Sequence, residues 1–206
     1  MTTLAHAWFN EFLKEFASNE EYLGDLDRQA GDGDFAVNLG SGLKRAQKRI
    51  QLLSGSPTDA EVFSAISLGF LDTGGTSGPL LGMWFRGIAR ALDDGFLTIA
   101  GLSEGIATGT ETIQRLGGAK VGDKTMVDAM VPASEALKEV AGQDGGLADA
   151  LAKAAESASQ GAQSTKEITA SLGRASYVGD LSTGVVDPGA EAIALFFAAG
   201  AAAASS

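Results

Sequence analysis

The chain has 206 residues, of which 45% are hydrophobic and 20% charged, a composition typical of a folded globular protein. Fifteen Lys and Arg against 26 Asp and Glu give a net charge of −11, which argues against nucleic acid as a partner because phosphate backbones bind clustered cations. The absence of cysteine excludes disulfides and thiolate metal sites. At this length we expect a single domain over residues 1–206.

The sequence carries no membrane signal. The start, MTTLAHAWFNEFLKEF, lacks the basic and apolar regions of a signal peptide. The longest apolar run, AIALFFAAGAAAA near the C-terminus, is too short and too rich in alanine to span a bilayer. We therefore expect a cytoplasmic protein that does not bind membranes.

Apolar residues recur at helical spacing through the first half of the chain. They predict a first helix around residues 4–16 and a second around residues 39–50. Thr58 and Glu61 have the spacing of a capping box and predict the start of a third helix. Pro79 stands where a proline in the first turn of a fourth helix belongs.

A fifth helix is predicted for residues 103–116, because Gly117 and Gly118 form a typical helix stop. A sixth follows Thr125, and Pro132 is expected to distort it if it lies beyond the first turn.

Three further helical segments follow. Residues 147–159 are rich in alanine and predict a seventh helix. Ser164 and Glu167 are expected to cap a short piece. Asp187 and Pro188 read as the N-cap and first residue of the last helix.

Alternating strand patterns are nearly absent, and only the segment STGVV is expected to be extended. The sequence therefore predicts an all-α fold of about eight helices joined by glycine-rich loops.

The segment DRQAGDGDFAVN, residues 27–38, holds three aspartates: Asp27, Asp32 and Asp34. By itself GDGD is also typical of an ordinary turn. An EF-hand is excluded, because the central glycine and closing glutamate do not fall at the required positions. Three carboxylates this close repel one another, so the segment requires either open water or a bound cation.

The segment GGTSGP, residues 74–79, has the features of an anion site. Its glycines let the backbone approach a ligand, and Thr76 and Ser77 offer hydroxyl groups. Pro79 begins a helix whose free N–H groups favour an anion, although a plain helix start explains the same residues. It is not a Walker A loop, because no lysine follows the glycines.

Lys124 and Arg174 supply cations in otherwise acidic loops. Taken singly, each is expected to be a solvated surface charge. Taken together with the other loops, the pattern has one chemical reading. Carboxylates hold Mg²⁺, and the metal, a helix N-terminus and an arginine hold a polyphosphate.

Four motifs in register carry a family resemblance. LDRQAGDGD, GGTSGP, GDKTM and GRASYVGD followed by VDPGA resemble the nucleotide-binding L subunit of dihydroxyacetone kinase, over essentially the whole chain. The resemblance implies an antiparallel barrel of eight helices, with ADP or ATP and two Mg²⁺ held in the loops at one end.

The resemblance also implies roles for individual residues. The implied metal ligands are Asp27, Asp32 and Asp34. The implied nucleotide-binding residues are Phe35, Asn38, Gly75, Thr76, Ser77, Gly117, Thr125, Met126, Arg174, Asp187 and Gly189. Two positions depart from the family: Phe35-Ala36 replaces His-Gly, and Val185 stands where histidine is usual. No catalytic residue is expected apart from this nucleotide and metal site.

The implied activity is phosphoryl transfer from the bound nucleotide to dihydroxyacetone, or a related short ketose, held on a separate K subunit. A phosphotransferase-system M subunit is the second implied partner and recharges bound ADP. Three alternatives stay open at this point. They are an ATP-exchanging kinase partner without an M subunit, a regulatory protein that reports nucleotide state, and the nucleotide-binding half of a fatty-acid kinase. The only histidine is His6, so the chain is expected to be inactive without its K subunit.

Overall fold

The computed structural model describes residues 2–143 and 145–206. Within these residues there are α-helices and 3-10 helices but no strands, which confirms the predicted all-α class. The elements in chain order are α1 (Leu4–Ala30), α2 (Phe35–Gln51), α3 (Asp59–Leu71), α4 (Ser77–Arg90), α5 (Ile99–Gly117), α6 (Val127–Ala141), α7 (Leu147–Ser164), η1 (Thr165–Glu167), η2 (Arg174–Ser182) and α8 (Pro188–Ala204).

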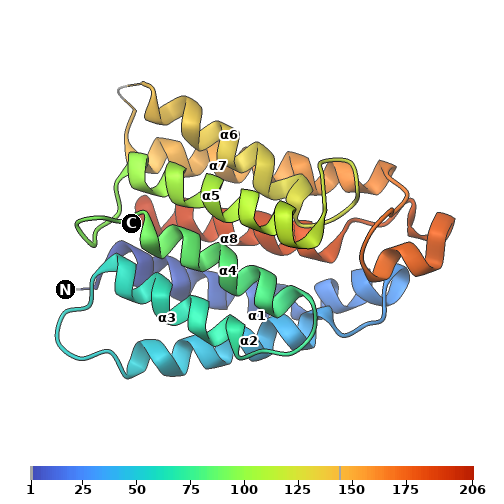
Figure 1. Ribbon diagram of the computed structural model, residues 1–206, viewed down its shortest axis with the longest axis horizontal. Helices are drawn as coiled ribbons and strands as arrows, with labels where there is room; N and C mark the ends of the chain where they lie inside the picture. The colour runs from blue at the N-terminus through green and yellow to red at the C-terminus, as the bar shows by residue number, and fades with distance from the viewer. Residues whose placement is uncertain (1, 144) are drawn as a thin grey trace.

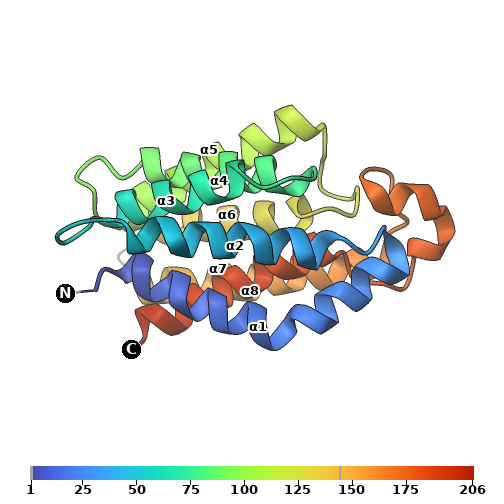
Figure 2. The ribbon, with the colours of Figure 1, turned by 90° about the horizontal axis from the view of Figure 1, so that it is seen from below.

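Successive helices run in opposite directions along the long axis of the molecule (Figures 1 and 2). Each α-helix packs against the next in the chain, and α8 packs against both α7 and α1, so the order of neighbours closes on itself. Because directions alternate, α2, α4, α6 and α8 all begin at the end where α1, α3, α5 and α7 finish. Both chain termini lie at the opposite end.

Aromatic side chains fix α8 against α1 and α4. The ring of Trp8 stacks on Phe196 with centroids 4.5 Å apart, and its Nε1 donates a hydrogen bond to the Phe196 carbonyl oxygen at 2.6 Å. Trp84 packs edge-on against Phe196 and donates from Nε1 to Thr110 Oγ1 at 3.2 Å. Both indole N–H groups are therefore satisfied inside the apolar core, which avoids a desolvation cost.

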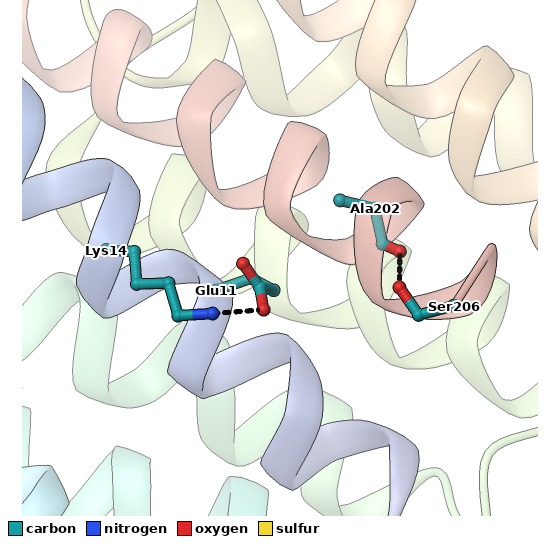
Figure 3. A network of polar contacts seen from close by, with 4 residues as sticks. All are labelled: Glu11, Lys14, Ala202 and Ser206. Carbon is teal, nitrogen blue, oxygen red and sulfur yellow. Dashed lines mark hydrogen bonds and ion pairs between the residues drawn. The ribbon is translucent and has the colours of Figure 1, made fainter.

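The outer surface contributes little by comparison. Figure 3 shows the face where α1 and the end of α8 lie beside each other. There Lys14 Nζ pairs with Glu11 Oε1 at 2.7 Å, and Ser206 Oγ donates to the Ala202 carbonyl oxygen at 2.8 Å. Both contacts are local and exposed, and a helical pair of this kind is worth only about 0.3–0.5 kcal/mol. In the described residues no helix is both long enough and apolar enough to traverse a bilayer.

Several predicted helix starts and stops are confirmed. Thr58 and Glu61 form the expected capping box at the start of α3. Gly118 ends α5 in the left-handed conformation, with φ of 73°. The Asp187 side chain accepts from the Ala190 N–H and caps α8. Helix α6 continues through Pro132.

Other expectations are wrong. Helix α1 extends to Ala30, so Asp27 lies in its last turn rather than in a loop. STGVV contains no strand, because its first residue ends η2 and a turn follows. The Ser164 hydroxyl donates back to the Gly161 carbonyl oxygen within α7 and does not cap η1.

Helices α4 and α5 approach each other through glycine. A Cβ on Gly105 of α5 would lie 2.7 Å from Cα of Ile88 in α4, and a Cβ on Gly87 would lie 2.9 Å from Cα of Gly109. The two helices therefore touch backbone to backbone, and there is no flexible side chain that could move aside.

We expect Gly105→Ala to lower the free energy of unfolding by about 1–3 kcal/mol, because the new methyl group overpacks a rigid contact. Thermal melts followed by circular dichroism measure the change. Gly142→Ala is the matched control, since the nearest atom to its Cβ lies 3.5 Å away and its φ is −83°. Equal melting temperatures for the two variants would contradict the close approach of α4 and α5.

Candidate functional site

A cavity of about 230 Å³ opens at the end of the molecule where α2, α4, α6 and α8 begin. All fourteen residues singled out from the sequence line it. They are Asp27, Asp32, Asp34, Phe35, Asn38, Gly75, Thr76, Ser77, Gly117, Thr125, Met126, Arg174, Asp187 and Gly189. Residues that are far apart in the sequence are thus brought to one place.

Three carboxylates gather at the junction of α1 and α2. Asp27 is 5% exposed, whereas Asp32 and Asp34 are exposed, and one carboxylate oxygen of each lies within 4.8 Å of the others. The Phe35 N–H donates to Asp27 Oδ2 at 2.8 Å and fixes the buried carboxylate. Burial raises the pKa of Asp27, and the charges of Asp32 and Asp34 add to the shift. The cluster is suited to a hard divalent cation with oxygen ligands.

Arg174, the first residue of η2, reaches across to this cluster. Its Nε lies 3.0 Å from Asp32 Oδ2, and both side chains are partly exposed. A solvent-exposed pair of this kind is weak, so a ligand can displace either partner at small cost. The arginine is therefore held next to the carboxylates but remains free to turn toward an anion.

The start of α4 forms the adjoining wall. Gly75 has φ of 79°, and a Cβ there would lie 2.9 Å from the Asn38 side-chain nitrogen, so the loop needs glycine for both reasons. Thr76 is the N-cap, but its side chain does not cap the helix. The first N–H groups of α4, with the hydroxyls of Thr76 and Ser77, are placed to receive an anion.

The opposite wall joins the starts of α6 and α8. Asp128, in the first turn of α6, accepts from the Gly122 N–H at 2.6 Å and from the Thr125 N–H at 2.7 Å, and so folds the preceding loop. A Cβ on Gly189 would lie 3.4 Å from Cβ of Met126. The end of the loop before α6 and the first turn of α8 therefore lie against each other.

Lys124 differs from expectation. Its side chain is 1% exposed, so it is not a solvated surface charge. Its Nζ donates to the carbonyl oxygens of Thr165, at 2.5 Å, and Val185. No signal in the sequence near Lys124 pointed to these acceptors, because backbone carbonyls occur at every residue.

The apolar part of the lining was also missed from the sequence. It is formed mainly by α4, α5, α6 and the segment before η2. Its members are Leu80, Ile113, Ala119, Val127 and Leu172. Each continues the apolar stripe of a helix or lies beside a site motif, which is the signal that could have found them. A planar base would find a dry surface here.

The charges of the lining favour a metal-bound anion over a free one. Four aspartates face the cavity against two cationic side chains, Lys124 and Arg174. A polyphosphate alone would be repelled, whereas divalent cations on the three clustered carboxylates would reverse the local field. The arrangement can therefore hold a metal–phosphate group beside an apolar slot.

The sequence model of the DAK2 domain matches residues 29–202. The chain belongs to the DAK2 domain family. The match covers every motif on which the resemblance to the L subunit of dihydroxyacetone kinase rested, apart from the first three residues of LDRQAGDGD, which include Asp27. That resemblance is confirmed.

Curated relatives of this DAK2 domain are named as kinases or as kinase subunits. It is 36% identical over 192 residues to "PEP-dependent dihydroxyacetone kinase 1, ADP-binding subunit DhaL" of Listeria innocua, covering 92% of this chain and 90% of the relative. It is 33% identical over 187 residues to the ADP-binding subunit DhaL of the PEP-dependent kinase of Escherichia coli K12, covering 90% and 89%. It is also 34% identical to the D-erythrulose kinase of Mycolicibacterium smegmatis, covering 91% of this chain and 33% of that protein.

The fold of the DAK2 domain is also found among solved structures. The dihydroxyacetone kinase of C. freundii, in complex with AMP-PNP and Mg²⁺, matches with a TM-score of 0.69 at 24% identity. The match covers 93% of this chain and 32% of that kinase, so the DAK2 domain spans about a third of its length.

The carboxyl group of Asp187, on the cavity wall, has a strongly raised pKa. Its carboxylate accepts from the Ala190 N–H at 2.7 Å. Burial raises its pKa from 3.8 to about 7, and the nearby charge of Asp128 adds to the shift. Between these two values the folded chain holds the proton more tightly than the unfolded chain. The contribution to stability is therefore complete below pH 3.8 and is lost as pH rises through 7.

We expect Asp187→Asn to raise the melting temperature at pH 8 and to have a smaller effect at pH 5, because asparagine still caps α8 but is never charged. Thermal melts from pH 5 to pH 8, without nucleotide or Mg²⁺, measure this difference. The exposed Asp180→Asn is the control for the change in net charge. A difference between wild type and Asp187→Asn that does not vary with pH would contradict the raised pKa.

Proposed function

We propose that this chain is the ADP- or ATP- and Mg²⁺-binding subunit of a kinase for dihydroxyacetone or a related short ketose, and that residues 1–206 form one nucleotide-binding domain. The ketose is held on a separate K subunit. The cytoplasmic location expected from the sequence stays a prediction.

One observation carries the proposal. The fourteen residues expected to bind metal and nucleotide come from six separate stretches of the chain, and all of them line one cavity. The three expected metal ligands also have carboxylate oxygens within 4.8 Å of one another. Chance would not gather residues chosen by motif alone at one end of an all-helical fold.

The residues present fit a nucleotide with two Mg²⁺. Asp27, Asp32 and Asp34 would hold the metal, which neutralises phosphate charge when bound. The N–H groups at the start of α4, with Thr76 and Ser77, would bind phosphate oxygens. Phosphoryl transfer depends mainly on positioning and charge stabilisation, and these groups supply both without a separate catalytic acid or base.

The apolar lining supports a binding surface for the base of the nucleotide. Ile113, Val127 and Leu172 offer a surface for a base, and Gly117 and Met126 lie among them. These residues come from α5, α6 and the segment before η2, whereas the carboxylates come from α1 and α2. The nucleotide would therefore lie across the end of the molecule, with its base toward α5 and α6 and its phosphates toward α2 and α4.

Exposed apolar side chains around this end support a protein partner. They lie on α2, α5, the loop before α6 and η2, which are elements that also contribute residues to the cavity lining. They are Val37, Leu116, Val121, Tyr177 and Leu181. Tyr177 is 81% exposed, and exposed tyrosine is common where one protein docks on another. A K subunit docked here would cover the open end and exclude water from the phosphates.

The names of the relatives bear on two further points, the phosphoryl donor and the ketose. The L subunits similar over about nine tenths of their own length are named PEP- or PTS-dependent, which favours a phosphorylated M subunit as donor over ATP exchange. The similarity to a D-erythrulose kinase supports a four-carbon ketose as well as dihydroxyacetone. Phe35, where the family has histidine, lines the cavity without a polar side-chain group.

We expect Asp34→Asn to weaken binding of ADP in the presence of Mg²⁺ at least about tenfold, equivalent to about 1.4 kcal/mol, because a charged metal ligand is lost. Isothermal calorimetry measures the affinity, and circular dichroism checks that helical content is unchanged. The control is Asp25→Asn, an exposed acid of α1 that makes the same charge change but does not line the cavity. Equal ADP affinity in the two variants would count against the metal site.

We expect the isolated chain to phosphorylate neither dihydroxyacetone nor erythrulose, because a three- or four-carbon ketose offers little surface to bind and the proposal places it on the K subunit. Adding a K subunit from a related kinase, with a phosphoryl donor, should restore turnover in a coupled assay. The K subunit alone is the control. Turnover of either ketose by the purified chain alone would overturn the assignment as a subunit, and nucleotide binding without turnover in any combination would favour a regulatory role.

A further inference from the structure

Lys124 occupies an unusual place for a lysine. Its side chain is 1% exposed, and its backbone has φ of 62°, in the left-handed region that residues other than glycine rarely adopt. The two Asp128 bonds to Gly122 and Thr125 fold the backbone on either side of it. The chain thus accepts an uncommon backbone conformation to direct this ammonium group inward.

The ammonium group joins three segments. Lys124 lies in the loop before α6. Its Nζ donates to the carbonyl oxygen of Thr165, which directly follows α7, and to that of Val185, which precedes α8. Thr165 strengthens the same junction, because its Oγ1 accepts from the Asp187 N–H at 2.8 Å. The start of α8 is therefore bonded to the loop before α6 and to the end of α7.

This arrangement is costly for stability. Burying an ammonium group away from water is unfavourable unless its hydrogen bonds and charge are compensated. Burial lowers the pKa of Lys124, and the carboxylates of Asp187 and Asp128 oppose that shift. An apolar side chain would fill the same space without the free-energy cost of burying a charge. We therefore infer that the lysine serves to fix the position of the segments it is bonded to.

The segments held in this way form one wall of the cavity. Thr125 and Met126 follow Lys124 directly, and Asp187 and Gly189 follow the bonded Val185. Gly189, in the first turn of α8, packs against Met126, so a shift of either segment would change the shape of the wall.

We propose that Lys124 is a positioning residue of the nucleotide site, whose bonds to the Thr165 and Val185 carbonyls set the spacing between the loop before α6 and the turn before α8. It acts through Met126 and Gly189 rather than as a phosphate ligand, since its side chain is buried and two of its three N–H groups donate to carbonyl oxygens. The proposal rests on the nucleotide-binding function proposed above.

Two variants test position separately from charge. Lys124→Met removes the bonds and the charge together. Thr165→Val removes the acceptor of the Asp187 N–H, together with a local bond from the same hydroxyl to the Ala162 carbonyl oxygen. It keeps the shape of the side chain and leaves Lys124 in place, and Thr165 does not line the cavity. Lys120→Met is the control, because Lys120 is an exposed residue of the same loop.

Calorimetry with Mg²⁺ and ADP gives the first measurement. We expect Lys124→Met to weaken affinity at least about tenfold, because it removes both bonds that join the loop before α6 to Thr165 and Val185. We expect Thr165→Val to weaken affinity about threefold to tenfold, because it removes one of the bonds that hold the segment before α8 and leaves those of Lys124. Lys120→Met should stay within about twofold of wild type. Wild-type affinity in Lys124→Met would overturn the proposal. So would a loss in Lys124→Met with none in Thr165→Val, since that pattern indicates attraction of phosphate by charge. If Lys124→Met does not fold, the ADP affinity of Thr165→Val alone tests the proposal, and wild-type affinity in that variant would overturn it.

Amide hydrogen exchange without nucleotide gives a second measurement that does not depend on the proposed function. The Asp187 N–H is bonded to Thr165 Oγ1 and the Gly184 N–H to the Lys166 carbonyl oxygen. Both should exchange faster in Lys124→Met than in Lys120→Met. Unchanged exchange would contradict the claim that the Lys124 bonds hold these segments together. If the wild type binds no ADP with Mg²⁺, the proposed function and this role in it both fail, while faster exchange would still identify the lysine as a structural tie.

Discussion

Mutual repulsion of Asp27, Asp32 and Asp34 is the constraint on which the site depends. Two unit charges 4.8 Å apart repel by about 1 kcal/mol in bulk water and by about 3 kcal/mol at a protein surface. The last turn of α1 and the Phe35 N–H hold the buried member in place, so the cluster cannot relax simply by moving Asp27 into water. Arg174 offsets part of the charge through Asp32. Bound divalent cations would remove most of the rest, and they would also attract a polyphosphate.

The alternating direction of the helices gives this cluster its surroundings. Because α2, α4, α6 and α8 begin at the same end, four positive helix termini converge on one cavity. Asp187 caps α8, whereas the carboxylate of Asp128, in the first turn of α6, accepts from the Gly122 and Thr125 N–H groups of the preceding loop. The starts of α2 and α4 have no side-chain cap and lie next to the three clustered carboxylates. In the proposed function the anion lies beside α2 and α4, and the starts of α6 and α8 form the opposite wall.

Much of this could be predicted from the sequence, and the failures have physical reasons. The stripe beginning at Leu4, the capping box at Thr58 and the cap at Asp187 depend on near neighbours in the chain, and all three are confirmed. Asp27 was expected in a loop because glycine and aspartate dominate the next residues, yet Leu23, Leu26 and Ala30 keep the helix packed to its end. Lys124 could not be placed, because its acceptors are backbone carbonyls 41 and 61 residues away. The roles of the residues that line the cavity stay predictions.

The central claim is that this cavity binds nucleotide through metal held on the three carboxylates. Calorimetric titration of ADP into the wild-type chain, with and without Mg²⁺ and after removal of any co-purified nucleotide, tests it most directly. The account predicts tight binding with Mg²⁺, at least about a hundredfold weaker binding without it, which corresponds to about 2.7 kcal/mol, and a stoichiometry of two Mg²⁺ per ADP in a companion metal titration. Equal affinity for ADP with and without Mg²⁺ would contradict it.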